Sequence, residues 1–187
     1  MNTLRNYFQV VRLFLPMTLS LCLLNSCDQT AEPSPSTLNQ GMGDDTIIAY
    51  NHQVVQAENQ EIDDFIRRYQ WSMNATPTGL RFMIYKKGNG VQAKIGTIVT
   101  IHYTIKKIDG DVIDSTDPSH PLDFELGKHE LNNGLEEGVL LMKTGDRAKF
   151  ILPSHLAYGL LGDLHKIPSR TILVYDLELV QVKQKQK

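Results

Sequence analysis

The sequence predicts an α+β domain in which a mostly antiparallel sheet is covered on one face by a short helix, with a second helix before the domain. Five or so segments after residue 78 alternate apolar and polar residues, which is typical of strands that bury one face. Between them, Leu135, Val139 and Met142 fall at i, i+4 and i+7 and form a single apolar stripe. Because a sheet must bury its apolar face, this helix is the expected cover.

Residues 1–27 have the features of a secretory signal peptide. Arg5 and Arg12, with no acidic residue, precede an apolar run from Leu13 to Leu24 that is too short to span a bilayer comfortably. The run ends in Leu24-Asn25-Ser26-Cys27, which resembles a bacterial lipobox, and this resemblance implies that Cys27 is the lipid attachment site. We therefore expect a protein of the cell envelope, anchored to a bacterial membrane by lipid, with its domain outside the cytoplasm. An uncleaved anchor or an ordinary signal peptide is the alternative.

Charge and cysteine content argue against several classes of function. Both cysteines, Cys22 and Cys27, lie in the signal segment, so the body of the chain has no thiol for a disulfide or a metal. The formal net charge is −2, and no basic stripe could displace counterions from phosphates, so no nucleic-acid partner is expected. The histidines show no paired metal-ligand spacing, and we expect no metal and no cofactor.

Two segments are expected between the signal and the domain. Residues 28–50 are predicted to be a flexible tether, because small and polar residues with Pro and Gly dominate most of this stretch. Residues 51–76 are predicted to contain an amphipathic helix, in which Ile62, Phe65, Ile66 and Tyr69 share one face. This stripe is expected to pack on the domain or on the tether, with docking to a partner or a second copy as the alternative.

Residues 77–187 are predicted to form the sheet domain. The clearest strand covers residues 97–107, where Val99, Ile101, Tyr103 and Ile105 point toward the core. Asp109-Gly110 is a strong hairpin signal after it. The other expected strands are Leu80–Tyr85, Val112–Asp114, Leu122–Leu126, Arg147–Pro153 and Leu173–Leu179.

Several short motifs follow one another over residues 79–180. They are His102-Tyr103-Thr104, Asp114-Ser115, Phe124-Glu125-Leu126-Gly127, Gly134-Leu135-Glu136-Glu137-Gly138-Val139, Ala157-Tyr158-Gly159 and Ile167-Pro168. In this order they resemble the FKBP-type peptidyl-prolyl cis-trans isomerases. The resemblance implies a twisted half-barrel sheet wrapped around the short helix, with a proline-binding pocket between them. It also implies isomerase activity on proline-containing polypeptides, which here would assist the folding of exported proteins.

The same resemblance implies which residues form the pocket. Its apolar wall corresponds to Tyr103, Ile113, Phe124, Leu131, Leu135, Ile167 and Tyr175, with Leu122 at the rim. Its polar groups correspond to Asp114, the backbone amide of Asn132 and the hydroxyl of Tyr158. The expected catalytic residues are Tyr103, Asp114, Phe124, Tyr158 and Tyr175, and the remaining ones are expected to bind substrate. Plain core packing is the alternative for the apolar residues, a surface carboxylate for Asp114 and a capped loop tyrosine for Tyr158.

The sequence departs from the family pattern at the pocket floor. Leu135 stands where the resemblance implies Trp in strongly active members, and Ile113 and Leu122 also replace aromatic residues. The alternative function is therefore a weakly active or inactive module that acts as a chaperone or binding subunit of an envelope, secretion or motility complex. Residues 160–167 are unusually apolar for an exposed loop, which predicts either a surface for a client or partner or packing across the pocket rim.

Overall fold

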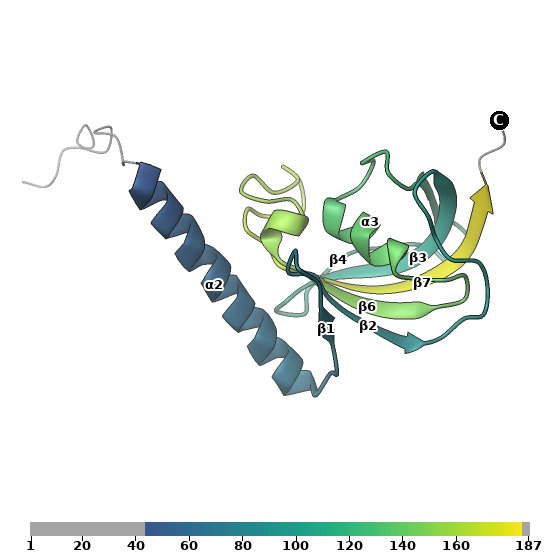
Figure 1. Ribbon diagram of the computed structural model, residues 1–187, viewed down its shortest axis with the longest axis horizontal. Helices are drawn as coiled ribbons and strands as arrows, with labels where there is room; N and C mark the ends of the chain where they lie inside the picture. The colour runs from purple at the N-terminus through teal and green to yellow at the C-terminus, as the bar shows by residue number, and fades with distance from the viewer. Residues whose placement is uncertain (1–43, 185–187) are drawn as a thin grey trace, which may run out of the picture. The chain divides into compact units, whose positions relative to one another are not determined.

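In the computed structural model, which describes residues 44–184, seven strands form one antiparallel sheet (Figure 1). The strand order is β1-β2-β6-β7-β3-β4, and β5 pairs with β3 off this path. This arrangement confirms the predicted α+β fold class. The strands are β1 (Asn74–Ala75), β2 (Arg81–Lys86), β3 (Thr97–Lys107), β4 (Val112–Ser115), β5 (Leu122–Glu125), β6 (Arg147–Leu152) and β7 (Leu173–Gln184).

The longest pairing joins β3 to β7, and it explains one departure from the predicted alternation. Val99, Ile101 and Ile105 are buried as predicted, but Thr100 between them is buried as well. The register between β3 and β7 shifts between Thr100 and Ile101. The extra residue, Val180, lies on β7, and Thr100 is paired there on both sides, with Gln181 of β7 and Asp123 of β5.

The short helix α3 (Asn133–Leu140) lies in the hollow of the curved sheet (Figure 1). Leu135, Val139 and Met142 are all buried, which confirms the predicted stripe. Glycine allows the helix to approach the sheet closely: a Cβ on Gly138 would lie 2.7 Å from the ring of Phe150 in β6. Any larger residue at Gly138 would therefore push α3 away from the sheet and open the pocket that lies beside it.

The N-terminal helix α2 runs over Asp44–Tyr69. It begins seven residues before the expected start at residue 51, within the stretch assigned to the tether, and it ends seven residues before residue 76. Its end has a clear cause. Gln70 adopts a left-handed conformation with φ 54°, and the N–H of Trp71 donates to the carbonyl of Ile66 at 3.1 Å, which is a Schellman-type helix end. The signal segment and most of the tether lie outside the described residues.

The C-terminal half of α2 packs on the outer face of the sheet. Ile62 and Phe65 form a second hydrophobic cluster with Ile151, Ile172 and Val174. Ile151 and Val174 belong to β6 and β7 and alternate with residues that face α3, so the two helices cover opposite faces of the sheet. Of the two predicted positions for the apolar stripe of this helix, Ile62 and Phe65 therefore occupy the one on the domain.

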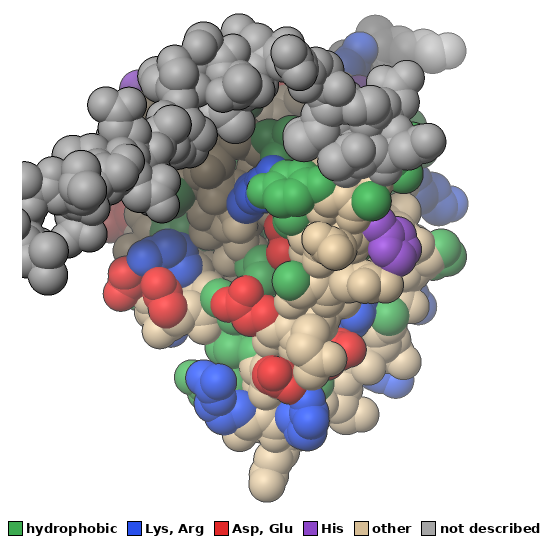
Figure 2. Space-filling model, turned by 90° about the vertical axis from the view of Figure 1, so that its left-hand side faces the viewer, with side chains coloured by type: hydrophobic (Ala, Val, Ile, Leu, Met, Phe, Trp, Pro, Cys, Tyr) green, Lys and Arg blue, Asp and Glu red, His purple; other side chains and the backbone are tan. Residues whose placement is uncertain are grey.

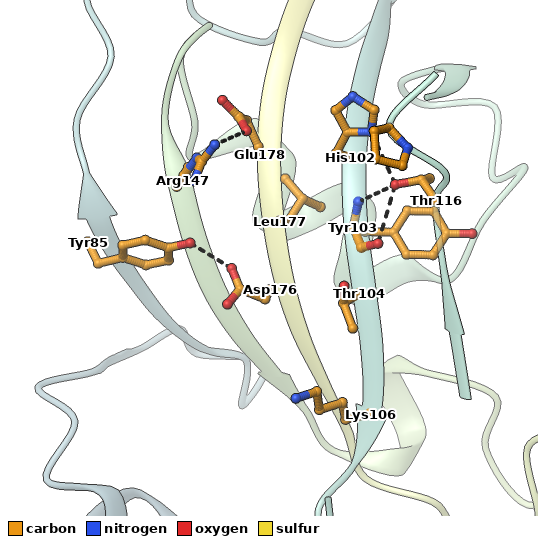
Figure 3. A pocket seen from close by; sticks show the side chains of 11 residues that line it. Tyr85, His102, Tyr103, Thr104, Lys106, Thr116, Arg147, Asp176, Leu177 and Glu178 are labelled. Atoms are coloured by element: carbon orange, nitrogen blue, oxygen red, sulfur yellow. Dashed lines mark hydrogen bonds and ion pairs between the residues drawn. The ribbon is translucent and has the colours of Figure 1, made fainter. Parts of the chain in front are cut away.

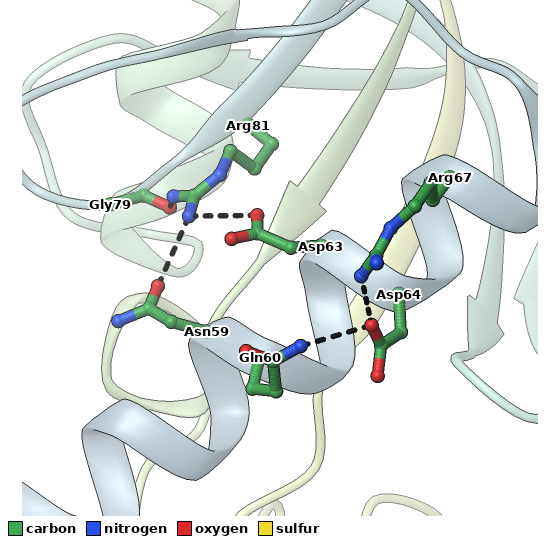
Figure 4. Close-up of polar contacts among 7 residues, drawn as sticks. All are labelled: Asn59, Gln60, Asp63, Asp64, Arg67, Gly79 and Arg81. Carbon is green, nitrogen blue, oxygen red and sulfur yellow. Dashed lines mark hydrogen bonds and ion pairs between the residues drawn. The ribbon is translucent and has the colours of Figure 1, made fainter.

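Polar contacts fix the position of α2 along the sheet. Glu58 is buried, and its carboxylate accepts hydrogen bonds from the backbone N–H and the hydroxyl of Ser154, at 3.0 and 2.6 Å. Figure 4 shows Arg81, at the start of β2, reaching the side chains of Asn59 and Asp63 on the helix. Ser154 belongs to a 3-10 turn, η2 (Ser154–Leu156), which leads toward the candidate site.

Residues Asp44–Lys187 form a compact unit separate from Met1–Gly43. Both hydrophobic clusters consist of residues after Asp44, so a chain that begins there retains the residues of both. No helix among residues 44–184 is both long and apolar enough to cross a bilayer. On the face shown in Figure 2, basic side chains are interspersed with acidic ones rather than gathered into a stripe.

Candidate active site

The apolar residues that the sequence assigned to the pocket meet in one cluster between the sheet and α3. Four of them are buried and four are partly buried at its margin. They come from β3, β4, β5, β7, α3 and the loops before α3 and β7, and are distant in sequence. The buried ones are Phe124, Leu135, Ile167 and Tyr175, and the partly buried ones are Tyr103, Ile113, Leu122 and Leu131.

A cleft of about 330 Å³ opens at the edge of this cluster. Its lining includes four predicted site residues, Ile113, Asp114, Tyr158 and Ile167. It also includes residues that the sequence reasoning did not assign to the site: Ile105, Asp163, His165 and Lys166. Strand alternation could have found Ile105, which follows Tyr103 on the same face, whereas no pattern marks the three loop residues. On its β3 and β4 side the cleft is lined by Ile105, Ile113 and the carboxylate of Asp114, and its loop side is mixed.

Tyr103 and Asp114 form the principal polar pair beside the cleft. The Tyr103 hydroxyl donates to the Asp114 Oδ2 at 2.9 Å, across the pairing of β3 with β4. Burial of the ring and the bond to Asp114 together raise the pKa of Tyr103 to about 12. The phenol therefore stays protonated at neutral pH, and the Asp114 carboxylate holds it in one orientation.

Asn132 contributes through its side chain, which the sequence reasoning did not anticipate. Its Oδ1 caps α3 by accepting from the Leu135 N–H at 2.9 Å, and its Nδ2 donates to the Tyr175 hydroxyl at 2.9 Å. Asn is among the residues preferred at a helix N-cap, so the signal was present in the sequence. One side chain thus joins the start of α3 to the pocket wall. Burial raises the pKa of Tyr175, whose ring centroid lies 6.4 Å from that of Tyr103.

Tyr158 lies at the opposite edge of the cleft, on the segment after η2. It is 37% exposed, and the turn that carries it is closed by hydrogen bonds from the Ala157 and Gly159 N–H groups to the Ser154 carbonyl, at 3.0 and 2.8 Å. Tyr158 lines the same cleft as Asp114, the hydrogen-bond partner of Tyr103.

A larger groove of about 440 Å³ lies on the outer face of the sheet and has a different character (Figure 3). Four of its polar side chains are already paired: the Tyr85 hydroxyl donates to Asp176 at 2.7 Å, and Arg147 forms an ion pair with Glu178 at 2.6 Å. Tyr103 is the one predicted site residue that lines it. The smaller, more apolar cleft is therefore the candidate active site. Among residues 44–184, no group of three or more His, Cys, Asp or Glu side chains could hold a metal ion.

Comparison with known proteins identifies the family. The model of the FKBP-type peptidyl-prolyl cis-trans isomerase family matches residues 89–180. FK506-binding protein 2 of Dictyostelium discoideum is 38% identical over 93 residues, which are 49% of this chain and 70% of that protein. The chain belongs to the FKBP-type peptidyl-prolyl cis-trans isomerase family. The matched region contains every residue of the candidate site except the supporting contacts from α2.

Two further FKBP proteins extend the comparison. The isomerase FkpA of Aeromonas hydrophila is 39% identical over 113 residues, which are 60% of this chain but 41% of that protein. The chain thus spans about two fifths of the FkpA relatives that it matches. The crystal structure of AtFKBP13 superimposes with a TM-score of 0.57 at 31% identity, over 59% of this chain and 98% of that one. The structure of FkpA from Escherichia coli gives a TM-score of 0.61 at 27% identity, over 74% and 65% of the two chains.

Proposed function

We propose that this FKBP-family protein catalyses the cis-trans isomerisation of peptide bonds before proline. The observation that carries the proposal is the convergence of Tyr103, Ile113, Phe124, Leu135 and Tyr175 on one apolar cluster beside a cleft lined by Asp114 and Tyr158. An apolar recess of this kind suits a proline ring. The phenol of Tyr158 at its edge can donate a hydrogen bond to the carbonyl that precedes the ring.

The chemistry requires no nucleophile. The barrier of about 18–20 kcal/mol arises from the partial double bond between the carbonyl carbon and the nitrogen. A desolvated site disfavours the charge-separated planar amide, and a donor that contacts the substrate more strongly when the amide is twisted lowers the barrier further. Tyr158, at the edge of the cleft, is the donor that we assign to the substrate carbonyl. Tyr103 and Asp114 bind each other, and we assign them the role of orienting the pocket wall.

The test is isomerisation of a short peptide that contains an apolar residue before proline, using the chain from Asp44. We expect acceleration above the uncatalysed rate, which has a time constant of tens to hundreds of seconds. Phe124→Ala should lower kcat/KM at least about tenfold, since a buried aromatic wall is lost. Val91→Ala, on an exposed loop at the opposite end of β3, should have no effect. A rate equal to the control without protein would refute the proposed activity.

The second candidate function is a binding module with little catalysis, and the side chain at the pocket floor favours it. Leu135 is buried at the start of α3, at the position where strongly active family members carry Trp. Leu135→Trp separates the two functions. A gain of about tenfold in kcat/KM would show that the floor limits catalysis. An unchanged, near-zero rate together with tight binding of a proline peptide would favour the binding module.

We further propose that the protein works at the cell envelope on exported polypeptides, anchored through lipid on Cys27. The proposal is supported by the Leu24–Cys27 sequence and by the similarity to FkpA proteins, and slow proline isomerisation limits folding wherever chains fold after export. In cells fed labelled palmitate, we expect label on the parent but not on Cys27→Ser. A Cys27→Ser protein that remains labelled and membrane-bound would contradict the anchor.

A further inference from the structure

Three leucines stand out on the loop beside the candidate site. Leu160, Leu161 and Leu164 are 63%, 78% and 83% exposed, although they belong to the segment between η2 and β7 that forms one side of the cleft. The sequence left open whether these residues pack across the pocket rim. Their exposure shows that they do not, so apolar surface is presented to solvent next to the cleft. We call residues 159–167 the leucine loop.

The leucine loop has a defined internal structure. The Asp163 carboxylate accepts hydrogen bonds from the backbone N–H groups of His165 and Ile167, at 2.9 and 2.7 Å, and the Asp163 N–H donates to the Ile167 carbonyl at 3.1 Å. Gly162 has φ +70°, and a Cβ there would lie 2.1 Å from the Ile167 carbonyl oxygen. The N–H of Arg170 closes the base of the loop by donating to the Gly159 carbonyl at 2.8 Å.

The position of Leu164 is unfavourable for a leucine in two respects. Its backbone is left-handed, with φ 64°, a conformation that costs a non-glycine residue about 1–3 kcal/mol. Its side chain is also the most exposed of the large apolar side chains among the described residues. Neither the backbone nor the core gains from a leucine here. A local cost of this kind is typical of residues that act on a ligand.

The segment that carries the exposed leucines also lines the cleft. Asp163, His165, Lys166 and Ile167 line it, and Leu164 lies among them in sequence. A polypeptide whose proline occupies the cleft must leave it past a rim, and the leucine loop forms the Tyr158 side of that rim. Tyr158 itself lines the cleft immediately before the loop begins.

We propose that the leucine loop binds apolar residues next to the substrate proline, so that the protein selects unfolded segments in which proline lies within an apolar stretch. This inference rests on the proposed isomerase function and adds the substrate class. Contact with three leucines would remove apolar surface from water on both partners. This is enough to raise kcat/KM about tenfold for a proline that has apolar residues on both sides.

The test compares two peptides of about twenty residues, each with a single proline and an identical residue before it. One carries leucines on both sides of that pair, and the other carries serines there. For the chain from Asp44, we expect kcat/KM to be about tenfold higher, and Kd about tenfold lower, for the leucine peptide. In the variant Leu160→Ser/Leu161→Ser/Leu164→Ser, the two peptides should have nearly equal kcat/KM and nearly equal Kd, so that both ratios between the peptides are about one. Because all three side chains are exposed, the fold should persist, which circular dichroism checks.

The matched control is Val91→Ser/Ile95→Ser. These side chains are 57% and 74% exposed but lie before β3, whereas the cleft adjoins Ile105 near its end. The control should keep both ratios at the parent value.

Each outcome decides one question. Ratios of about one in the parent, or ratios that survive in the leucine variant, would overturn the inference. Leucine-dependent sedimentation with phosphatidylcholine vesicles, combined with parent ratios near one, would also overturn it and identify the loop as a membrane contact. Failure of the isomerase proposal has a different signature, because neither peptide would then be isomerised. The Kd ratio would still report on the leucine loop.

Discussion

At the scale of single residues, the Tyr103–Asp114 pair gives a spectroscopic prediction. Replacing Asp114 by Asn removes a negative charge from the phenol, so the pKa of Tyr103 should fall from about 12 toward its ordinary value of about 10. It should not reach that value, because burial is the larger cause of the shift. NMR titration of ring-labelled tyrosine measures it. Asp111→Asn, an exposed carboxylate on the same hairpin, should leave the Tyr103 resonance unchanged.

The raised pKa of Tyr103 also makes stability depend on alkaline pH. The unfolded chain loses the tyrosine proton near pH 10, while the folded chain holds it until about pH 12. The stabilising contribution is therefore complete below about pH 10 and is lost as the pH rises through about 12. Urea unfolding should show a midpoint that falls over this range, and the fall should be smaller in Asp114→Asn. A parent midpoint that rises with pH there would contradict the assignment.

Leu164 gives the third residue-scale prediction. Glycine adopts the left-handed conformation without strain, so Leu164→Gly should raise the free energy of unfolding by about 0.5–1 kcal/mol despite the greater entropy of the unfolded glycine. Leu161→Gly is the control, since Leu161 is similarly exposed without a positive φ, and it should not stabilise the protein. Chemical denaturation measures both. A less stable Leu164→Gly protein would mean that the side chain has contacts that its exposure does not indicate.

These residues also show where sequence reasoning succeeds and fails. Tyr103 and Ile105 could be placed on the inner face because strand alternation is strict except at the bulge. The left-handed Leu164 could not be predicted, since its conformation opposes the preference of leucine and lies within a turn whose His165 and Ile167 N–H groups donate to the Asp163 carboxylate. The side-chain role of Asn132 was predictable in principle from N-cap preference, but the bond to Tyr175 depends on a strand that lies 43 residues away.

At the scale of secondary-structure elements, α2 is held against the sheet by the face that carries Ile62. Ile62 is fully buried against the outer face of the sheet, whereas Ile48 on the same helix is 65% exposed. We expect Ile62→Ala to cost about 2–4 kcal/mol of stability and Ile48→Ala to cost less than about 0.5 kcal/mol. Denaturant unfolding of the chain from Asp44 measures the difference. Similar values for the two variants would mean that α2 is not docked in solution.

The start of α3 depends on a buried carboxylate. Glu136 Oε2 accepts from the Gly127 N–H at 3.1 Å and ties the helix to the loop that carries Leu131, while its Oε1 has no hydrogen-bond partner among the described residues. Glu136→Ala leaves the Gly127 N–H without its acceptor and should cost about 1–3 kcal/mol. Glu136→Gln keeps an acceptor without a buried charge and should cost less. A larger loss of stability in Glu136→Gln than in Glu136→Ala would show that the charge itself is required.

The elements were predictable to different degrees for physical reasons. The stripe of α3 and most strands had clear periodicity and lie within a few residues of the prediction, but β7 continues five residues beyond Leu179, and β1, within the segment predicted to contain the helix, was not predicted. The start of α2 was predicted too late because residues 44–50 were grouped with the polar stretch with Pro and Gly before them, and its end was predicted too late because Gln70 rather than a glycine takes the left-handed position there. Helix ends that depend on a residue outside its usual preference leave no pattern in the sequence.

At the scale of the whole molecule, the sheet separates the candidate active site from the N-terminal helix α2. Its inner face, with α3, forms the cluster beside the cleft, and its outer face holds α2. The sequence could predict one apolar face and its helical cover. It could not predict the second cluster, because Ile151 and Val174 occupy the outward positions of strands that regular alternation assigns to solvent.

This separation predicts that α2 stabilises the domain without taking part in catalysis. A chain that begins at Thr76 lacks the helix, so Ile151, Ile172 and Val174 become exposed and Ser154 loses the carboxylate of Glu58. The loss of Ile62 and Phe65, of the partly buried Ile66, Trp71 and Met73, and of two hydrogen bonds to a charge amounts to at least about 4–6 kcal/mol, and this chain also lacks β1. The shortened chain should therefore unfold at a much lower urea concentration than the chain from Asp44. Below its unfolding transition it should keep the kcat/KM for a short proline peptide, because every residue of the cleft lies after Thr76.

The control for this truncation is a chain that begins at Gln53. It lacks the exposed first turns of α2, including the contact of Tyr50 with Arg170, but keeps Glu58, Ile62 and Phe65. Its stability should equal that of the chain from Asp44 within about 1 kcal/mol, since exposed contacts contribute little. Equal stability of all three chains would show that α2 does not support the sheet. A folded Thr76 chain with normal stability to urea but no activity would instead place α2 in the catalytic function.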